Sequence, residues 1–203
     1  MANFTKAPKP HLMTYQIARG EQGVLTYEPY KSYLLPHWRF RTVPIAQISS
    51  ETLWGKFLEF YDQQDFVGMD MSRKFIQMGM TRSKRYANYK GGKKYVGGKE
   101  KGNVNEKSKG HEGKEEKEEA SRIFREVWER CKAHEGYQEM KKVFLKEQKE
   151  WMAMERGKVK DEDGDEDPKA TTRASTRKNG RRKLRDEEGL IREESLRIKS
   201  END

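Results

Sequence analysis

The sequence predicts a predominantly α-helical α+β fold, in which a small N-terminal β-hairpin packs with about four or five helices and a disordered C-terminal tail follows. The hairpin is predicted from two short β-prone runs, residues 15–18 and 24–27, which flank a glycine-containing turn. After Gly157 apolar periodicity gives way to charged runs, which is typical of disorder. The strongest helical pattern places apolar residues at helical spacing on one face: Ala120, Ile123, Phe124, Val127, Trp128 and Cys131.

The first long helix is expected to begin at a serine cap, either Ser49 or Ser50. Asp65 is a plausible cap for a second helix that ends near Met78, because Gly79 then favours a break. The first of these helices should bury an aromatic face made of Leu53, Trp54, Phe57, Leu58 and Tyr61.

The last two helices are predicted to follow a long lysine- and glycine-rich loop. Helix resumes near Lys114, and Gly136 separates it from the next amphipathic segment. Because the link is short, we expect these two helices to form an antiparallel hairpin. The apolar face of the second one is marked by Tyr137, Met140, Phe144 and Trp151.

Three regions are expected along the chain. Residues 1–14 form a loose N-terminal arm, and residues 15–156 form a single α-rich domain. That domain carries a flexible Lys/Gly-rich loop at 91–113, which is nearly empty of large aliphatic residues. Residues 157–203 form a disordered tail that is first acidic and then basic.

Composition excludes several classes of protein. No apolar run is long enough to span a bilayer, and the first residues lack the apolar centre of a signal peptide, so we expect an intracellular, cytoplasmic protein. Nuclear entry is an alternative, because residues 177–185 resemble an import signal. Cys131 is the only cysteine, and its spacing from the four histidines matches no zinc template. No metal or cofactor is therefore predicted.

Excess positive charge is concentrated near the middle of the chain. The formal net charge is +9, and residues 70–110 contain 12 lysines and arginines against 3 acidic residues, a difference that also equals +9. A basic block with so little compensation is typical of proteins that bind phosphates or other polyanions. The alternative is a solvated face that only aids solubility.

The sharpest motif lies in residues 82–94, RSKRYANYKGGKK. On a helix, its arginines and tyrosines would share a face, where guanidinium groups bind phosphate and tyrosine rings stack on unpaired bases. In the alternative interpretation, the tyrosines face the core and the glycines end a helix. The spacing is not that of a P-loop. The predicted phosphate- or nucleic-acid-binding residues are Arg73, Lys74, Arg82, Lys84, Arg85, Tyr86, Tyr89, Lys90, Lys93 and Lys94.

A second constellation of ionisable residues lies in the N-terminal part. Polar groups on loops beside Trp38 could line a pocket, with His37 and Glu21 as acid–base partners. A structural role, with the glutamate paired to an arginine, is the alternative. The candidate pocket residues are Arg19, Glu21, Lys31, His37 and Arg39.

Five blocks follow one another in order along the chain: RGEQGVL at 19–25, EPYK at 28–31, LPHWRF at 35–40, DFVGMDM at 65–71 and RYANYKGG at 85–92. As a set they resemble the family known as domain of unknown function 4385. The resemblance covers roughly residues 15–151 and implies a domain boundary but no activity. Tyr89 stands where the family often carries a histidine, which argues against acid–base chemistry there.

The leading hypothesis is a non-enzymatic module that binds nucleic acid or another phosphate-containing polyanion through its basic Arg/Tyr/Lys surface. An enzyme acting on a small phosphate-containing substrate at the N-terminal cluster is one alternative. A protein-interaction scaffold that uses the helices at 114–156 is another. A deep pocket at the N-terminal cluster would favour the enzyme, and a continuous basic surface would favour the binding module.

Overall fold

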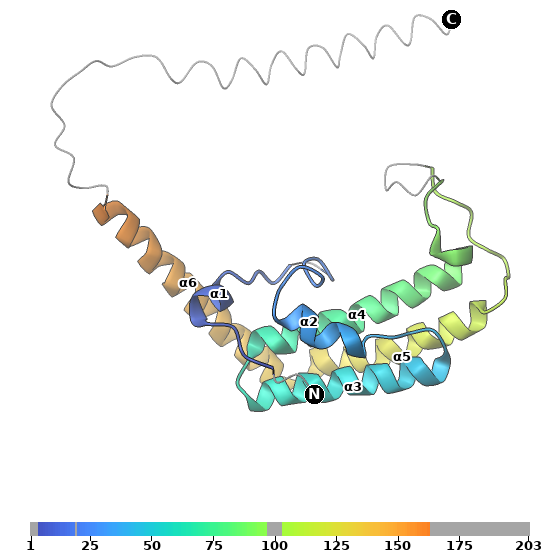
Figure 1. The fold of residues 1–203 in the computed structure, drawn as a ribbon, viewed down its shortest axis with the longest axis horizontal. Coiled ribbons are helices and arrows are strands. Elements are labelled where there is room, and N and C mark those ends of the chain that lie inside the picture. Colours follow the sequence, from blue (N-terminus) through green and yellow to red (C-terminus); the bar gives the residue numbers. More distant parts are fainter. Residues whose placement is uncertain (1–3, 19, 97–102, 163–203) are drawn as a thin grey trace, which may run out of the picture. The chain divides into compact units, whose positions relative to one another are not determined.

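Helices dominate the part of the chain that the computed structural model describes, residues 4–18, 20–96 and 103–162, with side chains described up to residue 157 (Figure 1). Contacts between Cα atoms group residues up to Lys158 into one compact unit. In chain order the elements are α1 (Lys9–Met13), α2 (Tyr30–Leu34), the 3-10 turn η1 (Leu35–His37), α3 (Val43–Asp62), α4 (Phe66–Asn88), the 3-10 turn η2 (Lys90–Gly92), α5 (Lys114–Ala133) and α6 (Glu135–Glu162).

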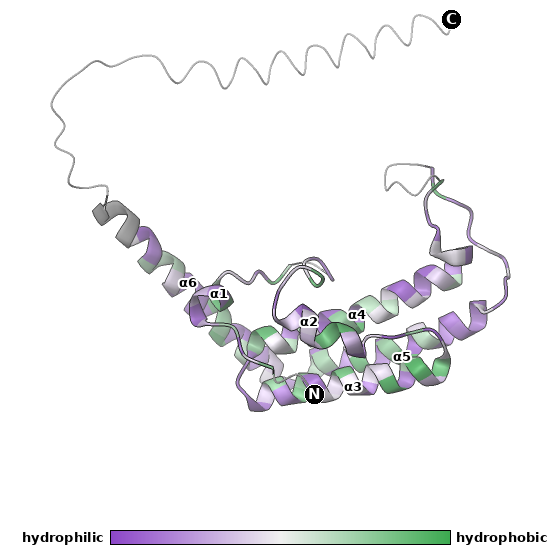
Figure 2. Ribbon diagram, in the orientation of Figure 1, coloured by the Kyte–Doolittle hydropathy of each residue, from purple (hydrophilic) through white to green (hydrophobic). Residues whose placement is uncertain are grey.

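Helices α3, α4 and α5 form a bundle in which each packs against the other two (Figure 1). Helix α4 is the most enclosed of the three, because its first turns are covered on every side, including by α2. Polar and apolar residues alternate along α3 and α5, as Figure 2 shows, so each helix turns one face to the core. The predicted apolar face of α5 is confirmed, since Ala120, Phe124, Val127 and Cys131 are buried.

The expected N-terminal β-hairpin is wrong. The described residues contain no β-strand, and their one bridge joins Tyr95 to Val104. Residues 20–29 form successive turns instead, in which Gly20 and Gly23 adopt positive φ angles of 68° and 78°. Local backbone hydrogen bonds close these turns, and the β-prone side chains are used to cover the helical core rather than to pair with each other. The fold is therefore helical and not α+β.

Two helix boundaries differ from the prediction. Helix α3 begins at Val43 rather than at a serine, because the hydroxyl of Thr42 accepts a hydrogen bond from Ile45 N and Pro44 fits the first turn. Helix α4 starts after its predicted cap, Asp65, which accepts a hydrogen bond from Gly68 N. It does not break at Gly79 but continues to Asn88.

The two C-terminal helices do not form the antiparallel hairpin that was expected. Only His134 separates α5 from α6, and one residue is too short a link to reverse the chain. Helix α6 instead leads away from the end of α5, and the two do not pack along their lengths (Figure 1).

Residues 4–14, expected to be a loose arm, pack on the core. The ring of Phe4 lies 5.1 Å from that of Phe60 and 4.8 Å from that of Tyr33, and Ala7 and Met13 are buried. Among the described helices, none combines the length and apolar character needed to cross a membrane. The tail from residue 163 onward, including the import-like segment at 177–185, lies outside the described residues.

Candidate nucleic-acid interface

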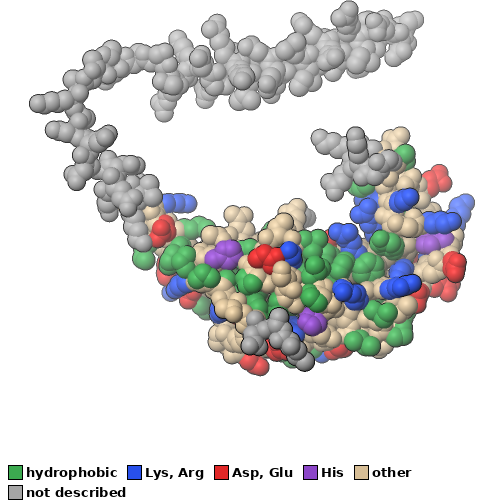
Figure 3. All heavy atoms as spheres, viewed as in Figure 1, with side chains coloured by type: hydrophobic (Ala, Val, Ile, Leu, Met, Phe, Trp, Pro, Cys, Tyr) green, Lys and Arg blue, Asp and Glu red, His purple; other side chains and the backbone are tan. Residues whose placement is uncertain are grey.

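The C-terminal end of α4 carries the basic motif to the surface. Arg85 and Tyr86 are exposed there and Arg82 is half-buried. Figure 3 shows Lys and Arg side chains gathered on the visible face at the end of the molecule where α4 meets the following loop. A pocket of about 660 Å³, here called the polar pocket, is lined by Arg82, Arg85, Tyr86, Gly91, Gly92, Lys93, Lys94, Tyr95, Val96 and Asn105.

The glycine turn after α4 shapes the polar pocket. Gly91 and Gly92 adopt positive φ angles of 64° and 69°, which L side chains rarely take. Arg85 Nε donates a hydrogen bond of 2.7 Å to Gly92 O, so the arginine holds the turn against the helix. The ring of Tyr86 packs directly on Gly92, because a Cβ atom at that glycine would lie 2.8 Å from it.

A second pocket, of about 880 Å³, is also lined by Tyr86 and is here called the aromatic pocket. The Phe40 ring centroid lies 5.0 Å from that of Trp38 and 5.8 Å from that of Tyr86. Tyr86 therefore belongs to both pockets, and its side chain is 38% exposed. The aromatic pocket is lined by Lys31, Ser32, Leu35, Pro36, Trp38, Arg39, Phe40, Arg41, Tyr86 and Lys117.

The loop that carries Phe40 is fixed by a lysine from α5. Lys117 Nζ donates hydrogen bonds to the carbonyl oxygens of Phe40, at 3.0 Å, and of Arg41. Burial, together with the nearby Arg41 guanidinium, lowers the pKa of Lys117 from its ordinary value, although Glu116 opposes the shift. These hydrogen bonds join Lys117 to two residues that lie 77 and 76 positions before it in the chain.

The walls of the two pockets contain eight cationic side chains and no carboxylate among the described residues. One of the eight, Lys31, pairs with Glu28 nearby. The guanidinium of Arg39 donates to the backbone oxygens of Leu35 and Trp38, whereas Arg41 has no ion pair in the described part of the chain. Most of the positive charge here is therefore not neutralised by neighbouring acids.

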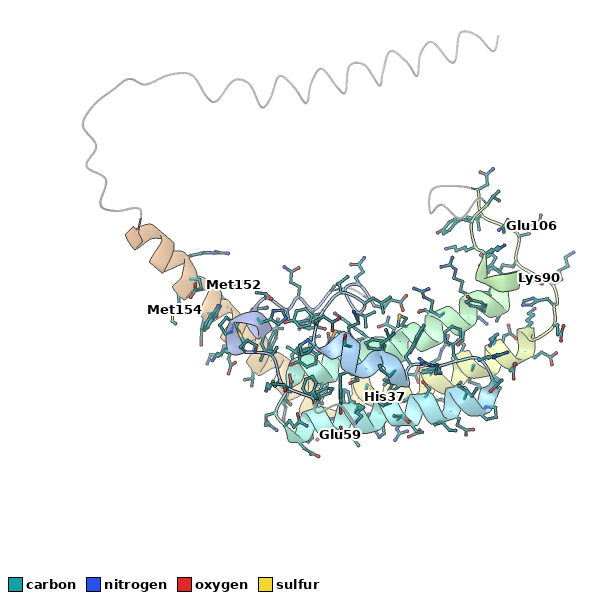
Figure 4. The ribbon with its side chains drawn as sticks, in the orientation of Figure 1. His37, Glu59, Lys90, Glu106, Met152 and Met154 are labelled. Carbon is teal, nitrogen blue, oxygen red and sulfur yellow. The ribbon has the colours of Figure 1, made fainter. Side chains whose placement is uncertain are left out.

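Five of the ten predicted binding residues do not line either pocket. Arg73 and Lys74 are buried against Asp70, so they cannot meet a ligand at the surface. The buried ring of Tyr89 agrees with the core-facing alternative, and Lys84 pairs with Glu118 at 3.4 Å. Lys90 is exposed at the loop end of α4, where Figure 4 labels it, but it does not line either pocket. The other five predicted residues line the polar pocket together: Arg82, Arg85, Tyr86, Lys93 and Lys94.

The buried partner of Arg73 and Lys74 was not singled out from the sequence. Asp70 accepts hydrogen bonds from Tyr15 Oη at 2.6 Å, Tyr137 Oη at 2.7 Å and Arg73 Nε at 2.8 Å. Lys74 Nζ lies 3.5 Å from Asp70 Oδ2 and 4.7 Å from the centre of the Tyr15 ring. None of these groups lines any of five pockets found in the described residues, and the network joins segments that are distant in the chain.

The N-terminal constellation is not assembled into one pocket. Lys31 and Arg39 line the aromatic pocket, and Arg19 lies outside the described residues. Glu21 accepts a hydrogen bond of 2.7 Å from Thr81 Oγ1 and lines a depression whose wall shares Arg82, Arg85 and Lys94 with the polar pocket. His37 lines neither pocket: its ring lies 6.3 Å from that of Tyr33, beside α3 (Figure 4).

The surroundings of His37 also disfavour an acid–base role with Glu21. Burial and the positive charge of Lys56 lower the pKa of His37 from its ordinary value. Two of the charges that act on His37, Lys56 and Glu59, lie on α3, and Arg39 of the N-terminal constellation adds to the lowering of its pKa. Among the described residues, no group of histidine, cysteine and acidic side chains could hold a metal ion.

Comparison with known proteins adds one relationship. No curated protein and no solved structure matches the chain. A family model matches residues 3–147, well over half of the chain and all of the bundle with both pockets. This match confirms the resemblance carried by the sequence blocks: the chain belongs to the family described as domain of unknown function (DUF4385).

Proposed function

We propose that the protein is a non-enzymatic module that binds the phosphate groups of a nucleic acid through the polar and aromatic pockets. The observation that carries this proposal is the pair of adjoining pockets with eight cationic side chains and no acidic one in their described walls. A polyanion placed there would meet positive charge in both pockets and no carboxylate in the described parts of their walls.

The polar pocket has the chemistry that phosphate binding requires. Arginine presents a planar set of donors that matches phosphate oxygens, and Arg82 has no carboxylate partner among the described residues. Lys93 is exposed beside it and is likewise without an ion pair there. The positive φ angles of the glycine turn let a phosphate approach the backbone closely.

Catalysis receives less support from the same residues. The pockets contain cations and aromatic rings, but neither contains a histidine or a carboxylate that could transfer a proton. The predicted acid–base partners His37 and Glu21 belong to different surroundings. Binding without turnover is therefore the function that these groups fit best.

A salt-dependent titration of the full chain with a labelled single-stranded oligonucleotide tests the proposal. We expect a dissociation constant in the micromolar range or below at low salt, and an affinity that falls steeply as salt rises. The double variant Arg82→Ala/Lys93→Ala should weaken binding and reduce the slope of log K against log salt concentration by about two.

The matched control removes two cations elsewhere. Lys142 and Lys149 are exposed on α6 and line neither pocket, so Lys142→Ala/Lys149→Ala causes the same change in net charge. The control should leave the slope nearly unchanged. If both double variants lose affinity equally, general charge attracts the nucleic acid and the pockets are not its site.

A protein-interaction role is the second candidate, because α6 exposes several large apolar side chains. Met152 and Met154 project from it beyond the bundle (Figure 4). Val143 and Leu145 are also exposed, at 57% and 45%. If the side of α6 that carries Val143 and Met154 is used in self-association, sedimentation of the full chain should show concentration-dependent oligomers that disappear in the variant Val143→Ser/Met154→Ser.

A further inference from the structure

We propose that the aromatic pocket holds one unpaired nucleobase while the polar pocket holds the adjoining phosphate, so that the ligand must be single-stranded. This inference rests on the proposed function and adds the class of nucleic acid and the division of work between the pockets. It assigns Trp38, Phe40 and Tyr86 to the base, and Arg82 and Lys93 to the backbone.

The three rings are inclined to one another, and Lys117 Nζ lies 5.7 Å from the centre of the Phe40 ring. The planes of Trp38 and Phe40 are inclined by 57°, and those of Phe40 and Tyr86 by 64°. Neither pair is stacked face to face, so the two rings of a pair do not cover each other's flat surfaces completely. A base entering the pocket can stack on a ring face, an interaction open to every base.

The size and lining of the aromatic pocket suit a base better than a phosphate chain alone. Its volume of about 880 Å³ lies in the range typical of small-ligand pockets, and Leu35 and Pro36 add apolar surface to the aromatic rings. Highly hydrated phosphates gain nothing from such a wall. In a duplex the base faces are covered by neighbouring pairs, so only an unpaired base can occupy this pocket.

Lysine and arginine side chains lie close to where the sugar–phosphate backbone of a bound single strand would be placed. Arg41 is exposed at the aromatic pocket, and Arg82 and Lys93 line the polar pocket. Tyr86 is a wall that the compartment rich in rings shares with the compartment rich in donors. A strand whose base enters the first compartment would place its phosphate beside the second.

Lys117 and Gly92 are positioning residues in this arrangement. The ammonium of Lys117 is engaged by the Phe40 and Arg41 carbonyl oxygens, which keeps the Phe40 ring at the pocket. Gly92 lies directly against the Tyr86 ring and so supports its position. Neither residue needs to touch the base in order to affect its binding.

Binding of three probes to the full chain separates this inference from the proposed function. The probes are a labelled oligothymidylate of about 12 nucleotides, an abasic strand with the same number of phosphates, and a duplex of equal length. We expect the oligothymidylate to bind about tenfold or more tightly than the abasic strand. The duplex should bind no better than the abasic strand.

Two variants assign the compartments. Phe40→Leu keeps the apolar volume but removes the ring, so it should reduce oligothymidylate affinity to near the abasic level without changing the salt slope. Arg82→Ala should weaken both strands by the same factor and lower the slope by about one. Tyr86→Leu, at a more exposed site, serves the same purpose as Phe40→Leu should that variant fail to fold.

Each outcome has a distinct meaning. Equal affinity of wild-type protein for the oligothymidylate and the abasic strand would overturn the base compartment and leave the proposed phosphate binding intact. Tighter binding of the duplex would overturn it as well. If none of the three probes binds at low salt, the proposed function itself fails.

Discussion

Tyr137 on α6 donates a hydrogen bond of 2.7 Å to Asp70 Oδ1 on α4, and both groups are buried. The other carboxylate oxygen, Oδ2, accepts a hydrogen bond from Tyr15 in the N-terminal segment. One aspartate therefore links three parts of the chain that are distant in sequence. Its charge is balanced by Arg73 and Lys74 from the next turn of the same helix.

Removal of the Tyr137 hydroxyl should destabilise the fold. Tyr137→Phe deletes one hydrogen bond to a buried, charged acceptor, and such bonds contribute about 1.5–3 kcal/mol. We expect a loss of this size in the free energy of unfolding, measured by urea denaturation. Tyr61→Phe is the control, because no hydrogen bond involves its hydroxyl in the described structure and its ring is only partly buried. Equal losses in both variants would mean that the bond to Asp70 adds no stability.

Ionisation of Asp70 should make stability depend on pH in acid. Burial opposes the charged form, but Arg73, Lys74 and the two tyrosine hydroxyls outweigh it, so the pKa of Asp70 lies below its ordinary value of 3.8. A lowered folded-state pKa means that the unfolded chain binds the proton more readily. The stabilisation is therefore complete above the ordinary value and is lost as pH falls from there through the folded-state pKa.

Unfolding free energies measured across this acid range check the prediction. The wild-type protein should lose stability as pH falls, and Asp70→Asn, although less stable near neutral pH, should lack the part of that slope due to this residue. If the unfolding free energy of the wild-type and Asp70→Asn proteins fell equally with pH, the lowered pKa of Asp70 would be contradicted. Solutions of constant ionic strength are needed, because the many exposed charges also respond to salt.

Two glycines inside helices should respond in opposite ways to replacement by alanine. A Cβ atom at Gly79 of α4 would lie 2.5 Å from the Phe124 ring of α5, whereas at Gly55 of α3 it would meet nothing within 4 Å. Gly55→Ala should stabilise the protein by about 0.5–1 kcal/mol, because alanine favours helix without a clash. Gly79→Ala should destabilise it, since overpacking typically costs about 1–3 kcal/mol. Thermal unfolding of both variants gives the signs, and a gain at Gly79 would disprove the close approach of α4 and α5.

Prediction from the sequence succeeded for helix faces, because their periodicity lies within one element. It was wrong where contacts between residues far apart in the chain determine the structure. The α5 face was recognised because Phe124 and its neighbours repeat at helical spacing within one element. Gly79 suggested a helix end because glycine lowers helix propensity, but its lack of a side chain is what allows Phe124 to pack there. The β-prone N-terminal runs were misjudged because their pattern does not reveal that they cover helices instead of pairing.

The same difference between local spacing and distant contacts explains which parts of the candidate site could be predicted from the sequence. Arg82, Arg85 and Tyr86 lie within four residues on one helix, so their common surface followed from spacing. Their meeting with Phe40 and Lys117 depends on packing between segments far apart in the chain. Lys74 resembled a surface cation because its tyrosine and aspartate partners could be identified only in the folded structure, where Tyr15 lies 55 residues from Asp70 in sequence.

The glycine turn after α4 offers a matched test of how Tyr86 is held. Gly91 and Gly92 both adopt positive φ, so alanine at either position strains the backbone to a similar degree. Only at Gly92 would the new Cβ press on the Tyr86 ring, at 2.8 Å, while at Gly91 it would meet nothing within 4 Å. Gly92→Ala should therefore weaken oligothymidylate binding by about tenfold, and Gly91→Ala should change it little although both lower the melting temperature. Equal loss of affinity in the two variants would show that the turn itself, rather than the placement of Tyr86, governs binding.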